Sequence, residues 1–338
     1  MVWVGNVEIK GDVTLSPMAG ISDSPYRRIT RRYGSAFSYT EFVSTEQILL
    51  GNQKSIDMFR FQEIERPISF QIFGSDLNTV VEAAKRIEPL RPDIIDLNMG
   101  CSVSKVSHHG SGAGLLRNLP LAGKMIEGMR KSLSVPVTAK IRLGWDEENL
   151  NYRESVHILQ ESGVSAISVH GRTKSMAYTG KADWESIGDI KSFAKVPIFG
   201  NGDVSSFYEA KEKIRKYGVD LVLIGRKAIG NPWIFSEQDK SSVSFSEIRK
   251  VVIEHLLAML DFYPSEDDYG LVLFRKHFAK YMEGTGFPKD LKSQMLQTSS
   301  LNTFLQLFSN YEETQTNTKL ETVELNDSLN CETYLVDV

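Results

Sequence analysis

Short apolar runs alternate with longer stretches of helical spacing over the first two thirds of the chain. The runs are rich in β-branched residues and have the length of strands, whereas in the stretches between them apolar residues recur every three or four positions. Eight strands are predicted, at Val13–Ala19, Phe37–Glu41, Ile68–Phe73, Ile94–Asn98, Val137–Arg142, Ala166–His170, Val196–Gly200 and Leu221–Ile224. The predicted helices between them include Asp76–Ile87, Leu121–Ser132, Tyr152–Ser162 and Phe207–Lys216.

Strands that alternate with helices indicate a parallel sheet, so the fold class is α/β. Eight such units over about 230 residues match the usual size of a closed (β/α)8 TIM barrel. The alternative is a doubly wound open sheet. The eighth unit favours the barrel, as does the lack of an early G-x-G-x-x-G turn.

A different pattern follows the barrel. The segment Phe235–Ser246 is polar and rich in serine, which predicts a linker. Beyond it, apolar residues at helical spacing predict two helices, around Ile248–Leu260 and Leu271–Met282, and a third is expected within Lys289–Phe308. We therefore predict a catalytic barrel at residues 1–238, a small all-helical domain at 245–310 and a disordered tail at 311–338.

Composition narrows the class of protein. Hydrophobic residues make up 41% of the chain and charged residues 24%, which is enough apolar material for a large core. The only cysteines, Cys101 and Cys331, exclude a disulfide framework and a cysteine-based metal site, and they suit a reducing compartment. With no signal-like start and no apolar stretch of membrane-spanning length, we expect a cytoplasmic protein without membrane or metal partners. We also expect a monomer.

The net charge of −4 argues at first against a nucleic-acid partner. The charge is unevenly distributed, because the tail from residue 311 holds seven acidic residues and one lysine. Of the 39 basic and 43 acidic residues, 38 and 36 therefore lie in residues 1–310, which carry +2. RNA would have to bind a local basic patch.

Candidate chemistry lies where the predicted strands end, because a closed parallel barrel forms its active site there. A lysine inside a buried strand, Lys140, must point toward something polar, which favours a functional role over a structural ion pair. His170 and Gln71 also lie at strand ends, and each taken alone suits a structural role about as well. Cys101 follows the strand that ends at Asn98, in a polar, glycine-rich loop where a core cysteine is not expected. The neighbouring Lys105, His108 and His109 are placed to tune its proton affinity.

Two turns after the last strands suit a phosphate. Gly200–Asp203 alone predicts no more than a tight turn, since glycine and asparagine tolerate positive φ. Gly225 and Arg226 follow the next strand, and TIM barrels often bind phosphate after their seventh and eighth strands. Backbone N–H groups would hold the phosphate and Arg226 would neutralise it.

Seven segments in order resemble the tRNA-dihydrouridine synthase family. They are Leu15–Asp23, Gln71–Gly74, Asp96–Cys101, Lys140–Trp145, Val169–Thr173, Gly200–Asp203, and Ile224–Arg226 continued by Gly230–Trp233. They span about residues 13–235, and Arg275–His277 is similar to the helical appendage of the family. One such motif is weak, whereas seven in order on one barrel are specific.

The resemblance implies an FMN-dependent oxidoreductase that reduces the C5–C6 double bond of specific uridines in tRNA to dihydrouridine, with NADPH or NADH as the reductant. Family flavin contacts correspond to Pro17, Met18, Gln71, Lys140, His170, Asn201, Gly202, Asp203, Gly225 and Arg226. Asn98 and Arg172 stand where the family holds the uracil or the flavin, and Cys101 where it has its general acid. From their spacing on one helix we expect Arg275, Lys276 and Lys280 to contact RNA on a face away from Phe274, although an ordinary solvated face is equally compatible.

The chain departs from the family pattern after the cysteine, where Ser102 replaces the usual proline, and at Lys227, where a small residue is usual. Neither change removes a catalytic group. Three other functions fit parts of the pattern: an FMN barrel acting on a free pyrimidine, such as a dihydroorotate dehydrogenase; an aldolase with Lys140 as Schiff base; and a non-catalytic RNA-binding module.

Overall fold

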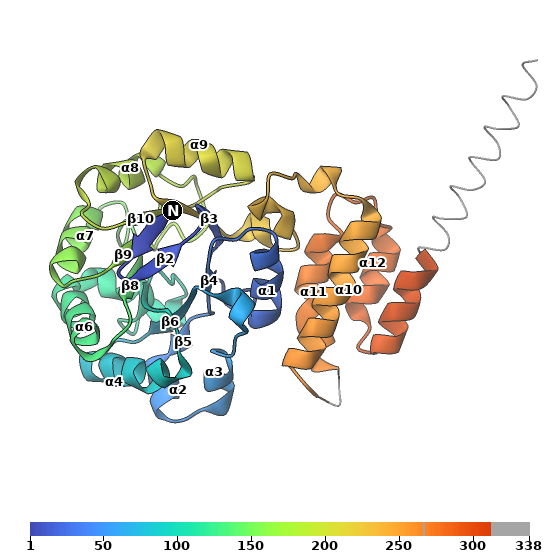
Figure 1. Ribbon diagram of the computed structural model, residues 1–338, viewed down its shortest axis with the longest axis horizontal. Helices are drawn as coiled ribbons and strands as arrows, with labels where there is room; N and C mark the ends of the chain where they lie inside the picture. Colours follow the sequence, from blue (N-terminus) through green and yellow to red (C-terminus); the bar gives the residue numbers. More distant parts are fainter. Residues whose placement is uncertain (266–267, 312–338) are drawn as a thin grey trace, which may run out of the picture. The chain divides into compact units, whose positions relative to one another are not determined.

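The computed structural model describes residues 1–265 and 268–311 (Figure 1). The predicted acidic tail lies outside the described residues, apart from Tyr311. The chain divides into two compact units, Met1–Ile248 and the chain from Arg249 onward. The first contains the barrel and the second is helical. None of the described helices is long and apolar enough to cross a membrane.

The first unit is a parallel eight-stranded barrel, as predicted. Its strands are β3 (Val13–Leu15), β4 (Ser38–Tyr39), β6 (Ile68–Phe73), β7 (Ile94–Met99), β8 (Val137–Arg142), β9 (Ala166–His170), β10 (Ile198–Asn201) and β11 (Leu221–Ile224). They pair in the order β3-β11-β10-β9-β8-β7-β6-β4. Two hydrogen bonds join the ends of this path, from Ala36 N to Val13 O at 2.8 Å and from Thr14 Oγ1 to Phe37 O at 2.5 Å.

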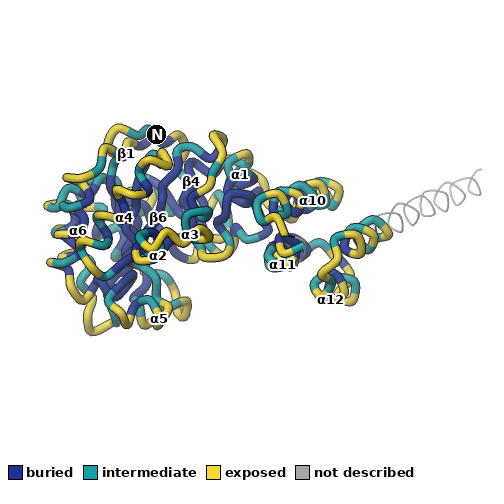
Figure 2. The backbone as a smooth tube through the Cα atoms, turned by 90° about the horizontal axis from the view of Figure 1, so that it is seen from below, coloured by how far each residue is buried: buried dark blue, intermediate teal, exposed yellow. Residues whose placement is uncertain are grey.

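Helices cover the outside of the barrel (Figure 1). The helices of the first unit are α1 (Ser24–Arg32), α2 (Thr45–Leu49), α3 (Gln53–Asp57), α4 (Leu77–Ile87), α5 (Ser104–Ser107), α6 (Leu119–Ser132), α7 (Tyr152–Glu161), α8 (Trp184–Phe193) and α9 (Phe207–Tyr217), of which α5 lies in the loop after β7. In α4, Asp76 caps the start by accepting from Thr79 N, and the apolar residues from Val80 to Ile87 recur at helical spacing on the buried side. Figure 2 shows the buried residues gathered in the barrel interior.

A hairpin at the N-terminus was not predicted. Strands β1 (Val2–Val4) and β2 (Val7–Ile9) pair antiparallel around Gly5 and Asn6, with Gly5 at φ 57°. Their buried residues join one apolar cluster with barrel residues such as Phe37, Phe199 and Leu221. A Gly-Asn pair between two apolar alternating triplets is a hairpin signal, although strands of three residues are easily missed.

Two strands end earlier than predicted, and the predicted strand Val196–Gly200 is shifted to Ile198–Asn201. The predicted Val13–Ala19 ends at Leu15, because Ser16 N still donates to Ile224 O but Pro17 has no N–H to continue the ladder. The predicted Phe37–Glu41 is reduced to Ser38–Tyr39, and a further short strand, β5 (Val43–Ser44), pairs with β6. The loops after these two strands thus begin four and two residues earlier than predicted at the carboxyl end of the barrel.

The segment predicted as a linker, Phe235–Ser246, contains local helical structure. The 3-10 turn Pro232–Phe235 ends where the segment begins, a second 3-10 turn covers Lys240–Ser242, and α10 (Phe245–Phe262) includes the last two residues of the segment. The helical unit continues with α11 (Tyr269–Tyr281) and α12 (Lys289–Gln297). A further helix covers 301–311. The range Lys289–Phe308, where one helix was expected, therefore holds α12 and most of this second helix. Phe278 packs against Phe304 and Phe308 at the centre of this unit.

His277 makes the stability of the helical unit depend on pH. Burial first, and the charge of Lys276 second, lower its pKa to about 3. The unfolded chain, with a His pKa near 6.5, therefore binds more protons than the folded one between these values, and stability falls as the pH drops below about 6.5. Between pH 7 and pH 5 we expect the free energy of unfolding to fall by about 2 kcal/mol.

Thermal melts of the full chain across this pH range measure the effect. His277→Leu should flatten the pH dependence, whereas His109→Gln, a change at an exposed histidine, should leave it intact. An unchanged slope in His277→Leu would assign the proton uptake to another group.

Candidate active site

The register of the strands brings the polar strand-end residues into one place. Gln71 pairs with Asp96, Asn98 with Lys140, and His170 with both Arg142 and Asn201. Side chains two positions apart on a strand share a face, so Asp96 and Asn98 lie on the same side of β7. The hydrogen bonds between these side chains show that this side is the barrel interior.

A chain of buried hydrogen bonds runs from Asp96 to the cysteine loop. Thr138 Oγ1 and Gln71 Nε2 donate to the two oxygens of Asp96 at 2.6 and 2.7 Å. Asn98 Nδ2 donates to Gln71 Oε1 at 2.8 Å. Asn98 Oδ1 then accepts from the backbone N–H of Cys101 at 2.9 Å. The amides of Gln71 and Asn98 each have one orientation that satisfies this chain, so their donor and acceptor ends are fixed.

Three backbone contacts hold Cys101. Besides the bond to Asn98, Cys101 O accepts from Ala113 N at 3.1 Å, and the preceding carbonyl, Gly100 O, accepts from Arg142 Nε at 2.7 Å. Hydrogen bonds therefore fix the backbone on both sides of the cysteine, although Ser102 stands where the family usually has proline. Gly112 allows the close fit, because a Cβ there would lie 3.0 Å from Cys101 Cβ.

The thiol of Cys101 is half-buried, and burial raises its pKa. A hydrogen bond from Val103 N–H and the positive charge of Arg142 act in the opposite direction and are smaller. The tuning groups expected from the sequence, Lys105, His108 and His109, are not among the causes of the shift. At neutral pH the group is a thiol, which is the form that donates a proton.

Lys140 lies inside the barrel with 8% of its surface exposed. Its Nζ donates to Asn201 Oδ1 at 3.1 Å, and Asn201 Nδ2 donates to Leu223 O at 2.8 Å, which fixes the amide. Burial and the charge of Arg142 lower the pKa of Lys140 to about 7, against a smaller opposing effect of Asp96. A buried cation without a carboxylate in hydrogen-bond contact is suited to a bound anionic group.

His170 is neutral. Burial, followed by the positive charges of Arg142, Lys140, Arg172 and Arg226, holds its pKa well below the ordinary value. Arg172 Nη1 lies 3.4 Å from His170 Nε2. Since arginine only donates, this contact assigns the acceptor role to Nε2 and leaves the proton on Nδ1.

Two arginines share one carboxylate at the barrel mouth. Asp203 accepts from Arg172 Nη2 at 2.6 Å and from Arg226 Nη2 at 3.1 Å. Burial opposes ionisation of Asp203, but the bonds from Ala182 N–H and Arg172, and the two positive charges, lower its pKa overall. Tyr178, whose ring is 60% exposed, lies 5.0 Å from the Arg226 guanidinium.

Arg172 has little left for a ligand. It is 1% exposed, and it also donates to Thr179 O at 3.0 Å and Gly180 O at 2.8 Å. Its hydrogen bonds join the loop after β9 to the turn after β10. The sequence expectation of direct contact with uracil or flavin therefore changes to a positioning role for this residue.

The turns after β10 and β11 have the features of a phosphate site. Gly202 has φ 138°, and a Cβ there would lie 2.4 Å from Ala182 Cβ, so only glycine fits. Within the described part of the chain, no acceptor is bonded to the N–H of Gly202, Asp203, Gly225 or Arg226. Four free donors on adjacent turns, with the exposed Arg226 beside them, match the donor set that a phosphate needs.

The remaining predicted flavin contacts lie beside these turns. Met18 Sδ is 3.7 Å from the position of a Cβ on Gly225, and Met18 N is bonded to Ser22 Oγ at 3.0 Å. Pro17 lies in the same loop after β3. The structure thus brings Gln71, Lys140, His170 and Asn201 together inside the barrel, with Gly202, Asp203, Gly225, Arg226, Pro17 and Met18 at its mouth. Buried polar groups and a phosphate turn on one barrel end fit a flavin mononucleotide.

The helical unit gives a correction. Arg275 is half-buried, and its Nη2 donates to Thr298 O at 2.6 Å and Gln297 O at 3.3 Å, so it caps the end of α12. The sequence placed it on a solvent face with Lys276 and Lys280. Lys276 is half-buried, and the exposed Lys280 pairs with Glu283 at 2.6 Å.

Two residues that position the site were not among the sequence candidates. Asp96 anchors Gln71, and Arg142 donates to Gly100 O, Thr173 O and Ala177 O. The strand periodicity could have identified both residues, because side chains two positions apart on a strand point to the same face. Asp96 lies two positions before Asn98, and Arg142 lies two positions after Lys140. A charged residue on the inner face of a buried strand needs partners, and here the partners are the site itself.

Comparison with known proteins gives one consistent match. The family model of dihydrouridine synthases (Dus) matches residues 14–319. A probable tRNA-dihydrouridine synthase of Rickettsia bellii is 34% identical over 293 residues, covering 84% of this chain and 89% of that protein. The tRNA-dihydrouridine synthase B of Pseudomonas aeruginosa is 35% identical over 302 residues, covering 87% and 90%.

Solved structures support the fold. The histamine dehydrogenase from Rhizobium sp. 4-9 superposes with a TM-score of 0.54 at 14% identity, over 77% of this chain and 50% of that one. A 2-naphthoyl-CoA reductase superposes with a TM-score of 0.55 at 12% identity, over 70% and 51%. The match covers about half of each of these longer chains, and at such identity it concerns the fold alone.

Proposed function

The chain belongs to the dihydrouridine synthase family, and from this premise we propose how its barrel mouth reduces uridine. The protein is a tRNA-dihydrouridine synthase, a flavin-dependent oxidoreductase that converts uridine in tRNA to dihydrouridine. The observation that carries the proposed chemistry is a protonated cysteine held by its backbone at the same barrel end as a buried lysine. The residue roles below are inferred from the contacts described above.

The cofactor is FMN, with NADPH or NADH as the reductant. Its phosphate would bind the free N–H groups of Gly202, Asp203, Gly225 and Arg226, with the Arg226 guanidinium beside it. Its ring would contact Pro17, Met18, Gln71, Lys140, His170 and Asn201. When bound, the flavin supplies the hydride that is added to C6 of uracil.

Cys101 supplies the proton. Addition of hydride at C6 leaves negative charge at C5 and on the uracil carbonyls, and the product needs a proton at C5. The raised pKa keeps the Cys101 thiol protonated at neutral pH, and its fixed backbone places it on the loop after β7. The second N–H of Asn98, whose first is bonded to Gln71, is free to donate to a uracil carbonyl.

Lys140 supplies positive charge inside the barrel. Its pKa of about 7 means that a bound anion would draw a proton onto Nζ, and the charged form then stabilises that anion. Arg142 does not have this freedom, since its guanidinium is bonded to three carbonyls. It acts as a positioning residue for Cys101.

The target base has to leave the RNA stack to reach this interior. We expect the RNA to contact both the barrel mouth and the helical unit, with Lys276 as the lysine of α11 that has no carboxylate partner among the described residues. Lys276→Ala should weaken tRNA binding about two- to fivefold at low salt and leave flavin content unchanged. Binding titrations at several salt concentrations measure this.

Arg275→Ala is a different test, because this residue caps α12. We expect it to lower the melting temperature, with a loss of tRNA affinity that follows from unfolding. If Arg275→Ala weakened binding without any change in stability, the capping contact would not be its main role. Full tRNA affinity in a folded Lys276→Ala protein would remove α11 from the RNA surface.

One experiment tests the function as a whole. Purified protein loaded with FMN is incubated with NADPH and unmodified tRNA, and dihydrouridine is mapped by position. Formation of dihydrouridine in tRNA but not from free uracil or uridine supports the proposal. Equal turnover of a free pyrimidine would favour a dihydroorotate dehydrogenase-like activity. A protein that takes up no flavin would leave the aldolase or RNA-binding alternatives.

A further inference from the structure

A cation cluster lies on the rim of the barrel mouth, apart from the proposed flavin site. Trp145 stands in the loop after β8. The guanidinium carbon of Arg117 lies 4.6 Å from its ring centre, and Lys174 Nζ lies 4.3 Å from it. We call Arg117, Trp145 and Lys174 the rim cluster. Cations this close to an indole ring are held in place by the ring's quadrupole.

The three residues come from three consecutive carboxyl-end loops. Arg117 ends the 3-10 helix Gly112–Arg117 of the loop after β7, which also carries Cys101. Lys174 stands in the loop after β9. Two hydrogen bonds join this loop to that of Trp145, from Lys174 N to Gly144 O at 3.0 Å and from Ser175 N to Trp145 O at 2.9 Å. The rim cluster is therefore rigid and belongs to the barrel end where the substrate enters.

The two cations of the rim cluster are not neutralised. In residues 1–265 and 268–311, neither Arg117 nor Lys174 has a carboxylate within salt-bridge distance. Several outer lysines differ, since Lys85, Lys131 and Lys216 each pair with a glutamate at 2.9 Å or less. Unpaired cations fixed on an aromatic ring are suited to an anion from outside.

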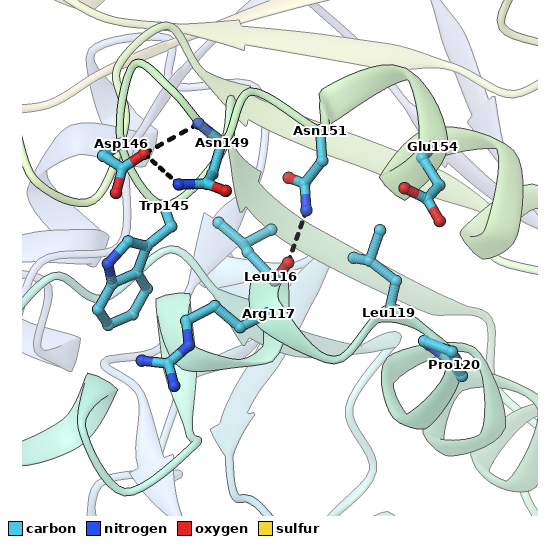
Figure 3. A pocket seen from close by; sticks show the side chains of 9 residues that line it. All are labelled: Leu116, Arg117, Leu119, Pro120, Trp145, Asp146, Asn149, Asn151 and Glu154. Carbon is cyan, nitrogen blue, oxygen red and sulfur yellow. Dashed lines mark hydrogen bonds between the residues drawn. The ribbon is translucent and has the colours of Figure 1, made fainter.

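A cavity of about 520 Å³ adjoins the rim cluster (Figure 3). Its wall includes Arg117 and Trp145, the apolar Leu116, Leu119 and Pro120, and the polar Asp146, Asn149, Asn151 and Glu154. The carboxylates would repel a phosphate inside the cavity, but they accept hydrogen bonds from ribose hydroxyls or base amino groups. Asp146 is partly committed, since it already accepts from Asn149 N and Nδ2.

We infer that the rim cluster and this cavity bind one nucleotide of the tRNA other than the target uridine. The phosphate lies against Arg117 and Lys174, and the ribose or base enters the adjoining cavity. The inference rests on the proposed function and adds a location for the RNA strand on the loops after β7, β8 and β9.

The test uses the full-length FMN-loaded enzyme and unmodified tRNA. Arg117→Ala with Lys174→Ala should raise the Kd for tRNA about tenfold at low salt. It should also reduce the slope of log Kd against log salt by about 1, since one phosphate contact contributes about 0.7–0.9. Trp145→Leu keeps both cations but removes the ring that holds them, so a smaller increase, about two- to fivefold, is expected.

Lys124→Ala is the matched control, because Lys124 is an exposed cation on α6, on the flank of the barrel. It should change neither Kd nor slope. Flavin content, melting temperature and the rate of flavin reduction by NADPH should stay at wild-type values in all variants. The assay of the wild-type enzyme tests the proposed function separately, because a wild type that forms no dihydrouridine would contradict that function before any variant is compared.

Three results would overturn the inference. One is a wild-type Kd and salt slope in a folded, flavin-loaded double variant. The other is a raised KM for NADPH with intact tRNA affinity, which would assign the rim cluster to the dinucleotide and not to RNA. The third is a loss of tRNA affinity in the double variant no larger than that in Lys124→Ala, which would show a general effect of charge and not a specific nucleotide site.

Discussion

Replacing Cys101 by alanine is expected to lower the rate of dihydrouridine formation by about 10²–10⁴-fold, the usual contribution of a positioned general acid. The thiol is the acid because burial raises its pKa and keeps it protonated at neutral pH. The backbone contacts of Cys101, to Asn98 Oδ1 and from Ala113 N, do not involve the side chain. Because these contacts remain, the loop should keep its shape in the variant even though the hydrogen bond from Val103 N–H to the thiol is lost.

The measurement is single-turnover oxidation of pre-reduced enzyme by tRNA, beside a melting curve. FMN content and NADPH oxidation by oxygen should stay close to wild type. Cys101→Ser should also be slow, because a hydroxyl is a much weaker acid than a thiol. A cysteine that only packed in the core would behave differently, since alanine or serine would then reduce stability and flavin content together.

Wild-type turnover in a stably folded Cys101→Ala protein would remove Cys101 from the mechanism. His108 and His109 would be tested next because they lie on the same loop. The ring of His108 lies 6.2 Å from that of Trp145, so His108 belongs to the outer rim of the barrel mouth and not to the barrel interior.

The sequence predicted the barrel well because its signal is repeated eight times. Each buried strand leaves an apolar run, and each covering helix leaves a period of three to four. The ends of the strands were harder. The shortening of the first strand to Val13–Leu15 depends on Pro17, which cannot donate to the ladder. The N-terminal hairpin was missed because six residues give little periodicity.

The site was predicted at the level of residue types and less well at the level of contacts. Lys140 was identified because a lysine inside a buried strand is unusual, and Cys101 because a core cysteine is not expected in a polar loop. Asn98 was identified through the family resemblance. The partners that fix them depend on the register between strands, which no local pattern carries. Asp96 and Arg142 were not candidates for this reason, and the capping contact of Arg275 depends on Thr298, which lies 23 residues further along the chain.

Lys140→Met is the second substitution for which a large effect is expected. It removes the one ammonium group that the structure describes in contact with Asn201 inside the barrel, and preorganised charge of this kind is worth about 10²–10³-fold in rate. We expect reduction of the bound flavin by NADPH to slow by about 10²-fold. The rate is measured from the loss of flavin absorbance. Methionine is of similar length and apolar, so the barrel interior stays filled.

Stability should not fall with activity in this variant. The pKa of Lys140, lowered to about 7 by burial, means that folding disfavours its charged form. The unfolded chain, with a Lys pKa near 10.4, binds more protons than the folded chain between about pH 7 and pH 10.4. Lys140 therefore lowers the free energy of unfolding of the wild type as the pH falls through this range. Methionine has no charge to bury, which offsets the lost bond to Asn201, and the melting temperature at pH 7 should be unchanged or higher.

The pH profile separates electrostatics from packing. In the wild type, the rate of flavin reduction should fall as the pH rises through the pKa of Lys140, since deprotonation removes the positive charge. A bound anionic ring would place this midpoint above the value of about 7 that holds without ligand. Lys140→Met should be slow and show no such midpoint. A fast variant, or one that keeps the wild-type midpoint, would show that another group carries the charge, and Arg226, the exposed cation beside the phosphate turn, would be examined next.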